Sequence, residues 1–343
     1  MNKFTRIFCI THEQDVDGLF CGAILKNTFR NTLVFLTNHS YENMKKAADV
    51  LERNVAQSKR FGTVVFSDLS LNNTVEADII GRSCLNAKQR GWEIVWLDHH
   101  NWNEEIIKRV QSFAKLILSA EHEQKCAAEL VYNHFAKGRT ACRRAAELAH
   151  IIDFRLPGVQ QLPPLAEIIA YYRIMSDNYT RLQHIIDNVS KGIYWNDDLQ
   201  EEYDKKYLPL KEEALLSAFK SLSLHNIGNY VIAVAQSQRL LAKSVLAERI
   251  FTEKPDAVIV VLFSPDGKIS IRRRPGEEDT IRCDLIASKL NGGGHGYAAG
   301  AIITKRNYND GDYSNHDFGI NSSPLQKQDV VQALQSVLGG AST

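Results

Sequence analysis

The sequence lacks a surplus of either charge. Its 343 residues contain 41 Lys and Arg against 40 Asp and Glu, which gives a formal net charge of +1. Proteins that hold long duplex nucleic acid mainly by charge carry a clear excess of basic residues. The near balance argues against that class and is compatible with a small or short anionic substrate.

Cysteine is also scarce, and the six cysteines are scattered, at positions 9, 21, 84, 126, 142 and 283. No Cys-x-x-Cys pair occurs, so we expect buried, unpaired thiols and a reducing compartment. The first residues do not form the apolar stretch of a signal peptide, and no later run is long enough to span a membrane. The sequence therefore predicts a soluble, cytoplasmic protein without membrane contact.

Short apolar runs alternate with helical patterns through the first 120 residues. Such runs are typical of strands that are buried on both faces, and their alternation with helices is typical of a doubly wound parallel sheet. We expect an α/β fold with strands near 6–10, 32–36, 63–67, 93–97 and 115–119.

A second α/β pattern follows a charged stretch, 196–220, that has helical character. Its strands are expected near 230–235, 257–263, 268–272 and 298–303, with helices near 240–251, 284–290 and 325–338. We therefore divide the chain into a first domain at 1–190, a helical linker at 191–226 and a smaller α/β C-terminal domain at 227–343.

Three of the predicted strands end in residues that can bind metal. Because parallel strands present their carboxyl ends at one edge of a sheet, these side chains should converge there. Crowded carboxylates repel one another, and a bound cation would neutralise them. Oxygen donors with a few imidazoles and no thiolate favour Mn²⁺ or Mg²⁺, with Zn²⁺ and Co²⁺ compatible. The residues are His12, Asp15, Asp17, Asp68, Asp98, His99 and His100.

Each group taken alone has a simpler interpretation. An Asp in the first group could cap the following helix, and Asp68 could belong to a turn. Two adjacent histidines behind a carboxylate at a strand end, Asp98-His99-His100, are harder to explain by packing. The coincidence of all three groups favours a metal site.

These motifs resemble those of the DHH phosphoesterase superfamily, which is named for the run found here at Asp98-His99-His100. Gly292-Gly-Gly-His295-x-x-Ala298-Ala-Gly300 is similar to the DHH-associated C-terminal domain. The similarity covers residues 1 to about 304. The family that it indicates includes RecJ-like enzymes, nanoRNases and phosphatases of adenosine 3′,5′-bisphosphate. It implies a metal-binding catalytic domain followed by a substrate-binding domain.

The resemblance also implies roles for the individual side chains. His12 and Asp15 would hold one Mn²⁺ ion, and Asp17 and His99 a second. Asp68 and the Asp of a fourth motif would bridge the two ions. Asp98 would orient His99 or a neighbour, which leaves His100 to face the scissile phosphate.

The fourth motif has two candidates. Asp153 ends the apolar run Ala149-His-Ile-Ile and lies 54 residues after His99. The small polar residues that often follow this Asp in the family are replaced by Phe154-Arg155. Asp177 is the rival. We favour Asp153, although either residue could simply be a carboxylate at a helix end.

The C-terminal candidates are a glycine loop and a run of arginines. Gly292, Gly293 and Gly294 could bring backbone N–H groups close to a phosphate, although such runs are commonly turns. Arginine suits phosphate because it can donate two parallel hydrogen bonds. The resemblance implies that His295 and a strand arginine, best matched by Arg272, hold substrate phosphate or ribose. Arg273 and Arg274 are either additional contacts or a solvated face.

The expected function is two-metal hydrolysis of a short single-stranded oligonucleotide, RNA in particular, to mononucleotides. Alternatives are a 3′,5′-bisphosphate nucleotidase, a linear or cyclic dinucleotide phosphodiesterase, and a RecJ-like exonuclease for single-stranded DNA. Pyrophosphatases that share the first domain are disfavoured because their C-terminal domain lacks the glycine-His loop. A non-catalytic replication or repair partner would be expected to have lost metal ligands, which are present here. A homodimer is compatible with the sequence.

Overall fold

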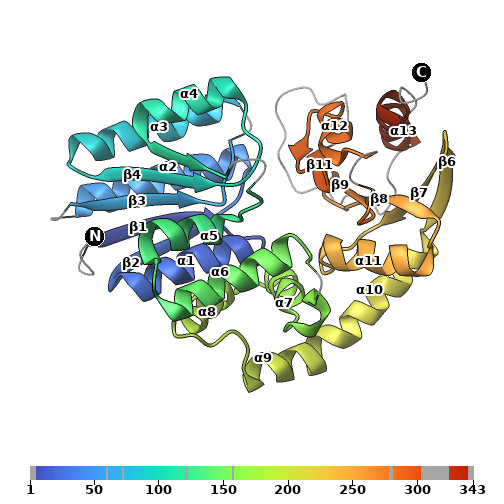
Figure 1. The fold of residues 1–343 in the computed structure, drawn as a ribbon, viewed down its shortest axis with the longest axis horizontal. Helices are drawn as coiled ribbons and strands as arrows, with labels where there is room; N and C mark the ends of the chain where they lie inside the picture. Colours follow the sequence, from blue (N-terminus) through green and yellow to red (C-terminus); the bar gives the residue numbers. More distant parts are fainter. Residues whose placement is uncertain are drawn as a thin grey trace. The chain divides into compact units, whose positions relative to one another are not determined.

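The computed structural model describes residues 5–58, 61–71, 73–119, 123–156, 158–277, 281–302 and 324–338. The chain divides into two compact units, Met1–Gln200 and Glu201–Thr343. Each unit contains its own β-sheet, as the sequence predicts (Figure 1).

The N-terminal unit is built on a five-stranded parallel sheet with the order β2-β1-β3-β4-β5. The strand order reverses beside β1, so β1 and β3 flank the point where open α/β sheets bind their ligands. The strands are β1 (Arg6–His12), β2 (Asn31–Thr37), β3 (Gly62–Ser67), β4 (Glu93–Asp98) and β5 (Lys115–Leu118).

Helices cover both faces of this sheet, which confirms the doubly wound α/β class (Figure 1). One face is covered by α2 (Tyr41–Gln57), α3 (Thr74–Gln89) and α4 (Glu104–Phe113). The other face is covered around α1 (Val16–Thr28), against which α5 (Ala127–Val131), α6 (Thr140–Asp153), α7 (Leu165–Tyr172) and α8 (Asn178–Ser190) pack. Short helical segments occur at Tyr132–Ala136 and Val159–Gln161.

A continuous helical stretch follows as α9 (Asp197–Glu202), a π-helical turn (Tyr203–Tyr207) and α10 (Leu208–Lys220). It corresponds to the charged stretch predicted to be helical. Of the linker predicted at 191–226, residues 197–220 are helical, whereas 191–196 are not, and its last residues belong to strand β6 (Ser223–Ile227). The reason is a tight hairpin in which Ile227 pairs with Tyr230 and Gly228 adopts a φ of 57°.

The C-terminal unit contains a mixed six-stranded sheet with the order β10-β11-β9-β8-β7-β6. Among the described strands of this sheet, only β7 and β8 pair in parallel. Beyond β6, the strands are β7 (Tyr230–Gln236), β8 (Ala257–Phe263), β9 (Lys268–Arg273), β10 (Gly293–Gly294) and β11 (Ala298–Ile302). Helices α12 (Cys283–Ser288) and α13 (Pro324–Leu338) pack on the apolar core of one face, and α11 (Lys243–Glu253) packs against β8 and β9.

All six cysteines are buried and none forms a disulfide, as the sequence predicts. Within the described residues, no helix combines the length and the apolar character that crossing a bilayer requires.

The glycines at 292 and 294 have a structural explanation, because the chain passes very close to β11 there. A Cβ atom at Gly292 would lie 2.1 Å from the carbonyl oxygen of Gly300, and Gly294 has a φ of 138°. Gly293 is different, since a Cβ atom there would meet nothing within 4 Å.

We expect Gly292→Ala to destabilise the C-terminal unit by about 1–3 kcal/mol, because β10 and β11 would be forced apart. Gly293→Ala should change stability by less than about 0.5 kcal/mol. Urea unfolding of both variants measures the difference. Equal destabilisation by the two substitutions would contradict the explanation. Lost activity in a stable Gly293→Ala variant would indicate that a ligand approaches this backbone.

Candidate metal centre

The predicted metal-binding side chains of the N-terminal unit converge at the carboxyl edge of the parallel sheet. His12 is the last residue of β1, Asp68 follows β3, and Asp98 ends β4 with His99 and His100 next in the chain. The convergence follows from strand direction alone, because all five strands run parallel.

Asp15 performs the capping role and also faces the site. One carboxylate oxygen accepts a hydrogen bond from the Gly18 N–H at 3.1 Å and caps α1, while the other lies 2.8 Å from Nδ1 of His12. The geometry of that second contact does not suit a hydrogen bond, and neither ring nitrogen of His12 has a hydrogen-bond partner among the described residues. His12 is 7% exposed. An imidazole with two such nitrogens in a buried position is typical of a metal ligand.

Gly18 allows α1 to start this close to β1. A Cβ atom at this position would lie 2.3 Å from the carbonyl oxygen of His12 and 2.7 Å from its Cβ. Any larger residue would therefore displace His12 or the first turn of α1. The glycine of the first motif is required by packing.

Asp17 is held by a helix that sequence reasoning did not connect with it. Both of its carboxylate oxygens accept backbone N–H groups at the start of α5, from Ala127 at 2.7 Å and from Ala128 at 2.8 Å. These N–H groups have no partner within the helix, and they carry its positive end. The same carboxylate lies 3.6 Å from Nε2 of His99.

Asp68 lies at the centre of the cluster. It is 1% exposed and has a φ of 55°, a left-handed conformation that is uncommon for residues other than glycine. One oxygen is 3.4 Å from Nδ1 of His12, and the other is 3.3 Å from Nε2 of His99. Asp68 therefore faces both histidines at once.

Among the described residues of this unit, the donor atoms form two overlapping groups, His12 with Asp15 and Asp68, and Asp17 with Asp68 and His99, and a third group joins Asp68 with Asp98 and His100. Within each group the donor atoms lie within 4.8 Å of one another. Asp68 is the residue that the first two groups share, and it belongs to the third as well. The grouping matches the division into two ions that the family resemblance implies, with Asp68 shared between them.

The buried carboxylates of the cluster would be stabilised by nearby positive charge. Burial raises the pKa of Asp68 well above its usual value, and the nearby carboxylates of Asp15, Asp17 and Asp98 raise it further. Burial also raises the pKa of Asp17. Among the described residues, the ion-pair partners of Asp15, Asp17 and Asp68 are all histidines. No Lys or Arg of this part of the chain neutralises them.

Asp98 orients His100. Its carboxylate, which is fully buried, accepts from Nδ1 of His100 at 2.8 Å and from Nε1 of Trp102 at 2.5 Å. Burial opposes ionisation of Asp98, but the His100 imidazole outweighs it and holds the pKa of the carboxyl well below its usual range. Trp102 has no metal-binding chemistry and could not be identified from the sequence.

Asp153 lies beside the cluster, whereas Asp177 does not. The Asp153 carboxylate, at the end of α6, is 3.8 Å from Nδ1 of His99. Asp177 is 2.7 Å from Arg181 in an ion pair at the start of α8. Asp153 is nevertheless outside both donor groups and beside the opposite nitrogen of His99. The structure favours Asp153 over Asp177, and its bridging role stays a prediction.

His39 is a residue of this edge that sequence reasoning missed. It follows β2, and its ring centroid lies 4.6 Å from that of His12 and 5.5 Å from that of His100. Its Nδ1 lies 3.1 Å from the carbonyl oxygen of Ser70. Burial, with His12 and His100 nearby, lowers the pKa of His39 to about 3, so the ring is neutral. The available signal was that β2 ends at the same sheet edge as β1, β3 and β4.

The three arginines of the C-terminal unit have different environments. The Arg274 guanidinium lies over the Phe251 ring and donates to the carbonyl oxygens of Phe251, Lys254 and Ala257. Arg274 therefore holds the end of α11 rather than forming a solvated face, and its contact with substrate stays a prediction. Arg273 donates to the carbonyl oxygen of Ile281 at 2.7 Å. Arg272 lies on the opposite face of β9 from Arg273.

The glycine loop ends in a turn at His295. The His295 N–H donates to the carbonyl oxygen of Ala298, and the His295 and Tyr297 rings are stacked with centroids 5.0 Å apart. Gly292 and Gly294 serve the close packing on β11 described above. That Gly293 and His295 bind substrate stays a prediction.

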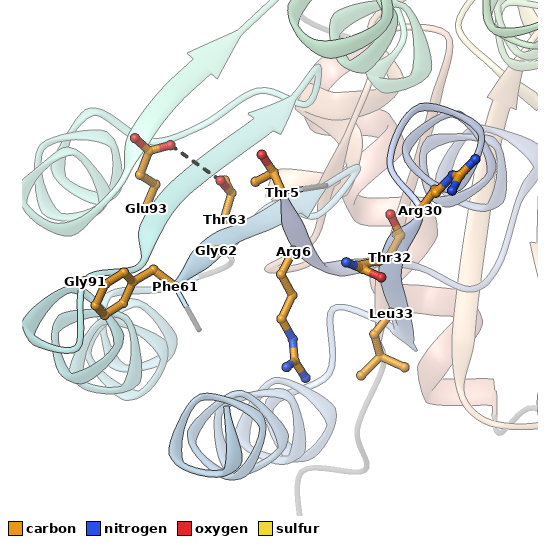
Figure 2. Close-up of a pocket in the computed structure, with 11 residues that line it drawn as sticks. Thr5, Arg6, Arg30, Thr32, Leu33, Phe61, Gly62, Thr63, Gly91 and Glu93 are labelled. Carbon is orange, nitrogen blue, oxygen red and sulfur yellow. Dashed lines mark hydrogen bonds between the residues drawn. The ribbon is translucent and has the colours of Figure 1, made fainter. Parts of the chain in front are cut away.

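An open hollow of about 820 Å³ lies at the other edge of the N-terminal sheet, at the amino ends of its strands. It contains none of the predicted site residues. Figure 2 shows that Arg6 and Arg30 point in different directions there, and that Thr63 and Glu93 are hydrogen-bonded to each other. The hollow therefore has no converging chemical groups, and the carboxyl edge is the better candidate.

We expect Asp68→Asn to abolish hydrolysis, because it removes the carboxylate shared by both donor groups. The same change should stabilise the protein in EDTA, since a buried negative charge that repels its neighbours is lost. Metal should stabilise the wild type by about 2.7 kcal/mol at 100 times Kd, and the variant by much less. Thermal unfolding with EDTA and with Mn²⁺ checks both effects. Near wild-type turnover in a folded variant would contradict the shared-ligand assignment.

Asp153→Asn should weaken metal binding about 10–100-fold and lower activity with it, as loss of a group that orients a ligand histidine does. Asp177→Asn serves as the matched control. It removes the ion pair with Arg181, and such surface pairs are worth about 0–1 kcal/mol. Isothermal titration with Mn²⁺ compares the two variants. The opposite order of effects would transfer the fourth-motif role to Asp177.

The comparisons with known proteins agree with the motifs in the C-terminal unit. A search of curated proteins finds no match. Among solved structures, an uncharacterized protein from Helicobacter pylori G27 is 19% identical, with 98% of this chain and 99% of that chain covered and a TM-score of 0.45. A putative family II inorganic pyrophosphatase from Methanococcus jannaschii is 10% identical, with 88% and 95% covered and a TM-score of 0.27. Such low TM-scores do not bear on fold or function. Residues 229–339 match the DHHA1 domain, which confirms the resemblance of this part of the chain to the DHH-associated C-terminal domain.

Proposed function

We propose that this chain is a two-metal phosphoesterase that hydrolyses short single-stranded oligonucleotides, RNA in particular, to mononucleotides. The observation that carries the proposal is the position of Asp68, whose carboxylate faces His12 on one side and His99 on the other. A carboxylate shared by two donor groups is the arrangement that places two cations side by side.

The residues present fit a pair of divalent cations. Donor atoms of His12 and Asp68 are buried without hydrogen-bond partners among the described residues, and such atoms are costly unless a ligand satisfies them. The two donor groups contain only carboxylates and imidazoles. This composition suits Mn²⁺, with Mg²⁺ or Co²⁺ as substitutes.

Bound cations of this kind lower the pKa of water and stabilise the negative charge that develops on phosphate oxygens. The chain's own groups provide orientation. Asp17 is fixed by the N–H groups of α5, so its carboxylate cannot rotate freely. Asp98 accepts from Nδ1 of His100, which directs Nε2 of that ring toward the substrate phosphate. The His100 side chain is 21% exposed and is therefore partly accessible to solvent.

The proposed substrate class depends on the charge balance and on the C-terminal unit. A chain with 41 basic and 40 acidic residues has no overall positive charge that would attract long nucleic acid. Arg272 lies in register with Ala298 of β11, so a residue with a very small side chain is its neighbour on that face. An arginine in such surroundings can bind a phosphate with two hydrogen bonds. We therefore propose that Arg272, Gly293 and His295 bind the part of the oligonucleotide away from the scissile bond.

Product analysis tests the substrate class. Labelled RNA and DNA of two to ten nucleotides, linear and cyclic dinucleotides and adenosine 3′,5′-bisphosphate are each incubated with enzyme and Mn²⁺. We expect mononucleotides from the shortest RNA oligomers at the highest kcat/KM. Exclusive turnover of the bisphosphate or of cyclic dinucleotides would replace the proposed substrate. Absence of all turnover by a protein that binds Mn²⁺ would support a non-catalytic role.

Arg272→Ala should raise KM for a short oligonucleotide and leave hydrolysis of bis-p-nitrophenyl phosphate unchanged, because that small ester offers no distal phosphate to bind. Arg249→Ala is the matched control, since Arg249 is an exposed arginine of the same unit that pairs only with Glu253 among the described residues. Equal losses on both substrates would mean that Arg272 serves the fold or the metal centre.

A further inference from the structure

Glu129 and His150 form a contact that the proposed function does not use. One carboxylate oxygen of Glu129, Oε2, lies 2.7 Å from Nδ1 of His150. The same oxygen accepts the backbone N–H of Cys126 at 3.0 Å. About a quarter of each side chain is exposed, 26% for His150 and 25% for Glu129. A pair this open to solvent contributes little to stability. Its main consequence is therefore geometric, because it fixes the helix on which Glu129 lies.

Glu129 lies in the first turn of α5, the helix that binds Asp17. Two backbone N–H groups of this turn, those of Ala127 and Ala128, donate to the Asp17 carboxylate. Glu129 closes the same turn by accepting the N–H of Cys126, the residue that precedes the helix, in a capping box. The helix has only five residues before it widens into a π-helical turn, and so short a helix depends on tertiary contacts for its geometry. The orientation of the N–H groups that bind Asp17 therefore depends on Glu129.

His150 connects this turn to the end of α6, where Asp153 lies. The two residues are three positions apart on α6, so their side chains lie on the same side of that helix. Asp17 is 3.6 Å from Nε2 of His99, and Asp153 is 3.8 Å from Nδ1 of the same ring. The contact between Glu129 and His150 thus joins the two helices that hold a carboxylate on either side of His99.

We propose that Glu129, held by His150, is a positioning residue for the second cation, the one expected between Asp17 and His99. The inference rests on the proposed function and names residues outside the ligand set that control one of its two metal positions. Neither Glu129 nor His150 belongs to a three-donor group among the described residues, so neither is expected to bind the metal itself. Residues that orient metal ligands typically change metal affinity about 10–100-fold when they are removed. The first cation should be affected much less, because its ligands follow β1 and β3 and receive no N–H group from α5.

The test titrates the full-length protein with Mn²⁺ and follows binding by calorimetry and by electron paramagnetic resonance. Glu129→Ala removes both contacts, whereas Glu129→Gln keeps one carbonyl oxygen that can accept from Cys126 and from His150. We expect Glu129→Ala to bind one of the two ions at least about 10-fold more weakly, and Glu129→Gln to bind both nearly as the wild type does. At metal concentrations that give the signal of a coupled Mn²⁺ pair in the wild type, Glu129→Ala should give the signal of an isolated ion.

A second variant removes the contact from the other side. His150→Ala leaves the capping contact of Glu129 in place, so it gives the same comparison if Glu129→Ala does not fold. We expect it to weaken the same ion. The double variant should bind no more weakly than Glu129→Ala, because both substitutions remove one shared contact. Circular dichroism and thermal unfolding in EDTA check that each variant is folded.

Asn196→Ala is the matched control. The Asn196 side chain accepts the Leu199 N–H at 3.0 Å at the start of α9, another short helix, and α9 contains none of the candidate ligands. This variant should bind both ions as the wild type does.

Three results would overturn the inference. Unchanged affinity for both ions in Glu129→Ala would show that the contact does not control the site. Equal weakening of both ions would place Glu129 in support of the fold as a whole. Equal defects in Glu129→Ala and Glu129→Gln would assign the effect to charge. Failure of the proposed function gives a different result, because a wild-type protein that does not bind two ions would overturn that function and the inference with it. Selective loss of one ion in a protein that cleaves no oligonucleotide would support the inference and replace only the substrate.

Discussion

The mutual repulsion of buried carboxylates is the constraint on which the rest of the N-terminal unit depends. Asp68 is 1% exposed, and its pKa is raised by burial and by the carboxylates around it. An isolated ionised carboxylate in such a place is costly, and a group that is not paired would protonate. The surrounding histidines are shared among several carboxylates, so a pair of divalent cations is the simplest arrangement that satisfies them all. The fold withstands the repulsion because the backbone positions are fixed by a fully packed parallel sheet.

The apolar core contributes to the site through a few specific contacts. Phe66 and Trp96 stack with their ring centroids 4.2 Å apart, and the Trp96 indole N–H then holds the carbonyl oxygen of Leu69. The loop after β3 is thereby fixed with Asp68 in its left-handed conformation. On the other side of the cluster, Thr11 donates to the carbonyl oxygen of Gly18 at 2.7 Å and keeps α1 against β1. The same contacts therefore pack the core and fix the geometry of the candidate metal site. Mutations of core residues behind the site should alter metal affinity.

The sequence predicted the parts of this site that depend on strand direction and local periodicity. Apolar runs identified β1, β3 and β4, and parallel strands necessarily bring His12, Asp68 and Asp98 to one edge. The runs could not show that the N–H groups of α5 hold Asp17, because Ala127 is 110 residues away in sequence and offers only backbone. They also could not show Trp102 bonded to Asp98. His39 could have been considered because β2 ends at the same edge of the sheet. A histidine between Asn38 and Ser40 is typical of a turn, however, and its local sequence does not indicate a function.

The C-terminal unit shows why a motif does not separate binding residues from structural ones. Strand residues alternate between faces, so Arg273 points with Ile271 toward the core side, and Arg272 and Ser270 point the other way. Ala298 and Gly300 of β11 stand directly beside Arg272 and Ser270, so the neighbours of these two residues on β11 have small side chains or none. Arg274 lies just after β9 and donates hydrogen bonds to carbonyl oxygens at the end of α11. Three consecutive arginines therefore have different surroundings. The alternation was readable from sequence, but the carbonyl groups that engage Arg274 belong to a helix end that only the tertiary structure brings there.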